Sequence, residues 1–91
     1  MSQITVDTFW NSENKETTTQ WISTTLFLLI EADLKHYPTP TTADVMLNLG
    51  ISDEVLARYV LTWTENFFLK LRRMTGSTKG VLKKLAQEGW N

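Results

Sequence analysis

The residues of this 91-residue chain best suited to chemistry are cations close to its C-terminal end. Lys79 and Lys83 are four positions apart, so they share one face if the segment is helical. Lysine and arginine side chains suit contact with phosphate groups, and a threonine hydroxyl suits a hydrogen bond to a base edge. The predicted contact set is Arg72, Arg73, Thr78, Lys79, Lys83 and Lys84.

The charge of the chain is unevenly distributed. Residues 1–69 carry three Lys/Arg against nine Asp/Glu, a balance of −6, and residues 70–91 carry six against one, a balance of +5, which sum to −1. Such asymmetry favours an anionic partner for the basic segment 70–91, either duplex DNA or an acidic protein. The alternative is that the two ends attract each other within the fold or across a dimer.

Other chemistry has little support in the sequence. His36 is the only histidine and has no neighbouring partner, cysteine is absent, and the four glycines are scattered. Metal sites need several converging ligands, and a catalytic nucleophile needs an orienting base. We therefore expect no enzymatic activity, no metal and no cofactor.

The longest periodic segment is a predicted helix over residues 53–74, with Ser52 as its N-cap and Gly76 as its stop. Its expected apolar stripe is Leu56, Tyr59, Val60, Trp63, Phe67, Leu71 and Met74. Leu61 and Phe68 lie off that stripe. Either another helix of the chain covers these two side chains, or they form the interface of a symmetric dimer. The dimer interface is the more specific of the two predictions.

Three further helices complete the predicted architecture. Residues 16–37 form a long apolar helix, Thr41 or Thr42 caps a short helix that ends at Leu49, and Ser77 or Thr78 caps a last helix that ends near Glu88. Residues 1–14 are expected to be an N-terminal arm held by Phe9 and Trp10. The fold class is thus all-α, with residues 1–91 as one domain of about four helices.

The N-terminal segment has no signal-peptide pattern. The longest apolar run, residues 26–30, is too short to span a bilayer. These features favour a cytoplasmic protein without a membrane partner.

Two segments resemble helix-turn-helix motifs. In the first, Ala43 to Tyr59, Gly50, Ile51 and Ser52 would be the turn. Asp53 and Glu54 would then face the groove and repel phosphate, so this motif is expected to be a scaffold.

The second segment, Leu71 to Trp90, contains STKGVLKKLAQEGW and resembles the recognition helix of winged helix-turn-helix proteins. The sequence departs from the family pattern at Arg72, where a small residue is usual, and at Ser77, where a hydrophobic residue is usual. The resemblance implies a DNA-binding helix whose groove-facing residues are cationic. The alternative is a capped amphipathic helix with a solvated lysine face.

The predicted function is a small regulatory or accessory protein that binds nucleic acid through its basic C-terminal helix. The competing prediction is a helical protein–protein interaction module that binds no nucleic acid, with a homodimer as one form of it. The first requires the cations to share an exposed face, and the second requires an exposed apolar patch.

Overall fold

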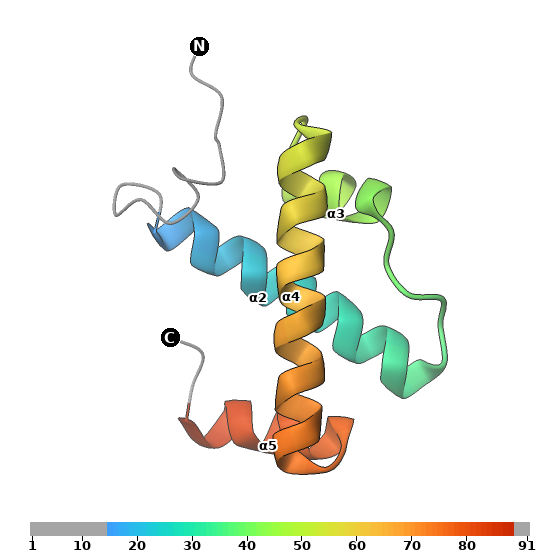
Figure 1. The fold of residues 1–91 in the computed structure, drawn as a ribbon, viewed down its shortest axis with the longest axis vertical. Helices are drawn as coiled ribbons and strands as arrows, with labels where there is room; N and C mark the ends of the chain where they lie inside the picture. The colour runs from blue at the N-terminus through green and yellow to red at the C-terminus, as the bar shows by residue number, and fades with distance from the viewer. Residues whose placement is uncertain (1–14, 89–91) are drawn as a thin grey trace.

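The computed structural model describes residues 15–88 as four helices, and no strand occurs among them. They are α2 (Lys15–Lys35), α3 (Thr42–Leu49), α4 (Glu54–Thr75) and α5 (Thr78–Glu88). Figure 1 shows α4 along the long axis, with α2 crossing it, α3 beside its first half and α5 across its last turns. The predicted all-α fold is confirmed. The proposed arm at residues 1–14 lies outside the described residues.

Local capping sets the ends of α3. The Thr41 hydroxyl accepts a hydrogen bond from the Asp44 amide, and the Asp44 carboxylate accepts one from the Thr41 amide. This capping box satisfies two amides that the first turn leaves without partners. At the other end Gly50 adopts a left-handed conformation, with φ of 67°, and its amide bonds back to Met46.

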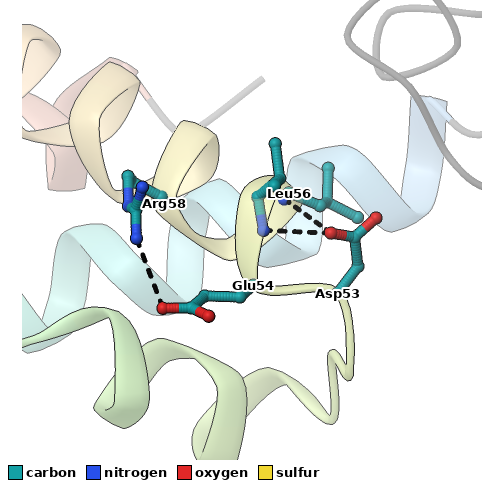
Figure 2. A network of polar contacts seen from close by, with 5 residues as sticks. Asp53, Glu54, Leu56 and Arg58 are labelled. Atoms are coloured by element: carbon teal, nitrogen blue, oxygen red, sulfur yellow. Dashed lines mark hydrogen bonds and ion pairs between the residues drawn. The ribbon is translucent and has the colours of Figure 1, made fainter.

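The N-cap of α4 is Asp53, and the prediction of Ser52 is wrong. The Asp53 carboxylate oxygen Oδ1 accepts hydrogen bonds from the amides of Val55 and Leu56, at 3.0 and 3.2 Å (Figure 2). One carboxylate oxygen thus serves two free amides at the positive end of the helix dipole. Glu54, the first residue of the helix, forms a salt bridge of 3.3 Å with Arg58 on the exposed face.

Helix α2 ends at Lys35, two residues earlier than the sequence predicts. His36 takes a left-handed conformation, with φ of 58°, and the Tyr37 amide donates to the Ala32 carbonyl at 2.8 Å. This is the hydrogen bond of a Schellman motif, in which glycine is the usual left-handed residue. The single histidine therefore ends a helix.

The core consists of two clusters along α4. The first joins Ile22 of α2, Val45 of α3 and Ile51 of the turn to Leu56, Ala57, Val60 and Leu61 of α4. The second joins Leu26, Leu29 and Ile30 of α2 to Phe68 and Leu71 of α4 and Val81 of α5. Because α4 enters both clusters, the other helices are assembled around it.

The buried face of α4 is rotated by about a quarter of a turn from the predicted stripe, at 100° per residue. Met74 is exposed, and Tyr59, Trp63 and Phe67 are only half-buried. The Trp63 and Phe67 rings stack on each other with centroids 5.4 Å apart. The small side chains of Ala57 and Thr64 take central positions because they allow neighbouring helices to approach closely.

Leu61 and Phe68 are core residues of the single chain. They are 7% and 6% exposed, and they pack into the first and second clusters respectively. The intramolecular alternative is therefore the one observed. A side chain already buried by α2, α3 and α5 has no apolar surface left for the predicted dimer contact.

Candidate nucleic-acid interface

The basic end of the molecule is built by the junction between α4 and α5. Gly76 ends α4 with φ of 85°, and its amide donates to the Arg72 carbonyl at 2.7 Å. The Ser77 hydroxyl oxygen accepts from the Gly80 amide at 3.0 Å, so Ser77 caps α5. Thr78 is consequently the first residue inside the helix.

Glycine at position 80 lets the two helices meet closely. A Cβ atom there would lie 2.9 Å from the carbonyl oxygen of Thr75 and 3.0 Å from its Cβ. The first turn of α5 is therefore fixed against the last turn of α4, which holds the cations of both helices at one end of the fold.

Four cations at this end are exposed and form no ion pair with any residue of 15–88: Lys70, Arg73, Lys79 and Lys83. We call these four the basic surface. No acidic residue occurs from position 70 to position 87. The nearest carboxylates on the same two helices are Glu65 and Glu88, and Glu88 pairs with Lys84, so the positive potential of the four cations is largely retained.

Two other predicted contact residues already have partners. The Arg72 Nη1 atom lies 3.9 Å from Asp33 Oδ1 of α2, and its guanidinium carbon lies 5.8 Å from the centre of the Phe68 ring. Lys84 Nζ lies 3.1 Å from Glu88 Oε1. A phosphate group would have to compete with these carboxylates for either side chain.

Thr78 does not take its predicted role. Its side chain is 5% exposed, and its hydroxyl donates a hydrogen bond to Asp33 Oδ2. The hydroxyl therefore faces the protein and cannot reach a base edge. Sequence analysis missed Asp33, because its two partners on α4 and α5 are far from it in the chain and leave no local signal.

An open cavity of about 490 Å³ lies between α2 and α4, next to this polar contact. Leu29, Ala32 and Phe68 contribute apolar walls, whereas His36 and Glu65 contribute polar groups.

Within residues 15–88, no three His, Cys, Asp or Glu side chains converge to hold a metal ion. None of the helices in this part of the chain is long and apolar enough to cross a membrane.

The first helix-turn-helix segment, formed by α3, the turn and the start of α4, has a different surface. Leu47 and Val55 are 83% and 71% exposed, and the exposed acidic residues Asp44 and Glu54 are close to them in sequence. Apolar and acidic side chains of this kind do not suit phosphate contact. The basic surface is thus the better candidate for an interface with nucleic acid.

Comparison of the chain with protein-family models, with curated proteins and with solved structures finds no match. Its function has to be inferred from its own side chains. The resemblance of residues 71–90 to winged helix-turn-helix proteins stays a prediction.

Proposed function

We propose that the protein binds nucleic acid through the phosphate backbone of duplex DNA, using the basic surface of α4 and α5. The observation that supports this function best is the set of four exposed cations, Lys70, Arg73, Lys79 and Lys83, without carboxylate partners in residues 15–88. Each phosphate contact releases condensed counterions, so exposed cations held on a rigid junction favour such binding.

The expected binding is weak and independent of base sequence. Thr78, the side chain predicted to read a base edge, donates its hydroxyl to Asp33 instead. Phosphate contacts position a protein on the duplex but carry no sequence information. This corrected contact set replaces Thr78 with Lys70 and relies less on Arg72 and Lys84, which have acidic partners.

The test is a titration of labelled, mixed-sequence duplex DNA with the protein at several salt concentrations. Fluorescence anisotropy of the DNA measures the affinity at each concentration. The double variant Lys79→Ala/Lys83→Ala should bind more weakly to all sequences. The slope of log affinity against log salt should flatten by about 0.9 for each lost contact.

Arg58→Ala is the matched control for this double variant. Arg58 is an exposed cation of α4, but it pairs with Glu54 near the opposite end of that helix. Its removal should leave the salt slope unchanged. Wild-type protein that does not bind duplex DNA at low ionic strength would reject the proposed function, as would an equal loss in the Arg58 variant.

A second candidate is a protein-interaction module, favoured by large apolar side chains on the surface: Phe27, Tyr37, Leu47, Val55, Leu69 and Met74. This function requires that duplex DNA does not bind and that Lys79, Lys83 and Lys84 dock on an acidic protein. The DNA titration at low salt separates the two candidates directly.

A further inference from the structure

An apolar groove of about 290 Å³ runs between α2 and α5. Its floor includes the buried side chains of Leu26 and Ile30, and its α5 wall is formed by Leu82, Leu85 and Ala86. Among residues 15–88, no charged side chain lines it. Water in this groove therefore contacts almost only hydrocarbon, which makes filling it with an apolar side chain favourable.

Phe27 stands at the edge of the same groove and projects into solvent. Its side chain is 67% exposed although it is one of the groove's lining residues. Leu34, seven residues further along α2, is also partly exposed and lies on the same side of the helix. One face of the molecule thus carries an unfilled apolar groove and an uncovered aromatic ring.

We infer that this face is a two-fold interface between two copies of the chain, in which Phe27 of each copy inserts into the groove of the other. A two-fold dimer requires one surface to be complementary to itself. Here a single surface contains both the projecting ring and the groove that can receive it. The inference does not depend on the proposed function.

The charges of the two groove helices support a second copy as the occupant. Residues 17–35 carry Glu31 and Asp33 against Lys35, a balance of −1. Helix α5 carries three lysines against one glutamate, a balance of +2. Pairing that brings α2 of one copy against α5 of the other would bring Lys79 and Lys83, which have no carboxylate partner in residues 15–88, toward acids of the opposite sign. Glu31 and Asp33 stay 56% and 39% exposed beside their own partners, Lys35 and Arg72.

The basic surface remains available in such a dimer. On a helical projection, Lys79 and Lys83 lie about 20° and 60° beyond Ala86, and thus at one edge of the groove-lining row. Their ammonium groups would lie at the rim of the interface, where contact with solvent or phosphate continues.

The experiment is sedimentation velocity of the full chain from low micromolar to several hundred micromolar concentration. The wild-type protein should sediment as a dimer at the upper end of this range. Phe27→Asp removes the inserted ring, and Ala86→Glu places a charge in the groove, so each variant alone should be monomeric. Both positions are exposed, and circular dichroism should show unchanged helix content.

Mixing the two variants gives the decisive result. In a homodimer of either variant both ring-in-groove contacts are disrupted, whereas in the mixed dimer the intact Phe27 ring of the Ala86→Glu copy can enter the groove of the Phe27→Asp copy, which has lost only its Phe27 edge. The mixture should therefore recover dimer that neither variant forms alone. Leu47→Asp, which changes an exposed apolar residue on α3, should leave the wild-type dimer unaffected.

Three outcomes would overturn the inference. The first is a wild-type protein that stays monomeric at the highest concentration, and the second is a Phe27→Asp variant that dimerises as well as wild type. The third is a mixture of the two variants that remains monomeric.

Discussion

The Thr78 hydroxyl donates a hydrogen bond to the Asp33 carboxylate, which joins the first residue of α5 to α2 across 45 positions of the chain. The other oxygen of Asp33 lies 3.9 Å from Arg72 of α4. One carboxylate therefore contacts both helices that form the basic end. The position of α5 depends on a polar contact as well as on the packing of Val81 and Leu85.

Thr78→Val should reduce the free energy of unfolding by about 1–2 kcal/mol, since hydrogen bonds to charged groups contribute more than neutral ones and Asp33 keeps some solvent access. In a domain of this size each kcal/mol lowers the melting temperature by roughly 4–8 °C. Thr62→Val, at an exposed position of α4, is the control and should change stability little. Equal melting temperatures for the two variants would show that the Asp33 contact contributes nothing.

Phe68→Ala should cost on the order of 3–5 kcal/mol, because it leaves a cavity in the second core cluster. Phe67→Ala should cost clearly less, because that ring is only half-buried. Chemical denaturation of both variants gives the comparison. A larger loss for Phe67 would support the apolar stripe expected from the sequence over the rotated face that the structure shows.

Gly80→Ala should destabilise the protein by about 1–3 kcal/mol despite the better helix propensity of alanine, because overpacking outweighs that gain. The new Cβ would lie 2.9 Å from the backbone oxygen of Thr75, which cannot easily move. Gln87→Ala, at an exposed position of the same helix, is the control for propensity alone. Thermal melting of a Gly80→Ala variant more stable than wild type would contradict the close contact.

Thr25→Val should stabilise the protein by about 1 kcal/mol, because it replaces a buried hydroxyl with a methyl group of similar size. The Thr25 side chain is fully buried, and its Oγ1 atom has no hydrogen-bond partner in the part of the chain that the structure describes. Thr64 is the matched control: it is equally buried, but its hydroxyl donates to the Val60 carbonyl at 2.7 Å. Urea denaturation should show a gain for Thr25→Val only, and an equal gain at both positions would mean that hydroxyl pairing is irrelevant.

The helices themselves could be predicted from the sequence because their signals are local. Thr41 and Asp44 form their capping box within one turn, and Gly76 stops α4 through its own left-handed conformation. Asp53 and Ser52 were harder to distinguish because both residue types cap helices well. In the structure Asp53 is the N-cap, and its carboxylate accepts two amide hydrogen bonds.

The candidate site was less predictable because its contacts connect distant segments. Periodicity identifies an apolar stripe, but the neighbouring helices determine which part of a broad stripe is most buried, as Met74 and Phe68 show. Thr78 is polar and stands among lysines, so its sequence context indicates a solvent-facing side chain. Only the approach of Asp33 from α2 explains why its hydroxyl is buried.

The central place of α4 has a consequence for the order of events during protein synthesis. α2 and α3 leave the ribosome first, yet Ile22, Leu26 and Val45 are buried in clusters that require α4. Isolated helices shorter than about 12–15 residues are marginal in water, which applies to the eight-residue α3. α2 is longer, but its apolar face has no packing partner on α4 until residues 54–75 have emerged. The nascent chain therefore exposes its apolar α2 until α4 has emerged, and chaperone contact in that interval would protect it from aggregation.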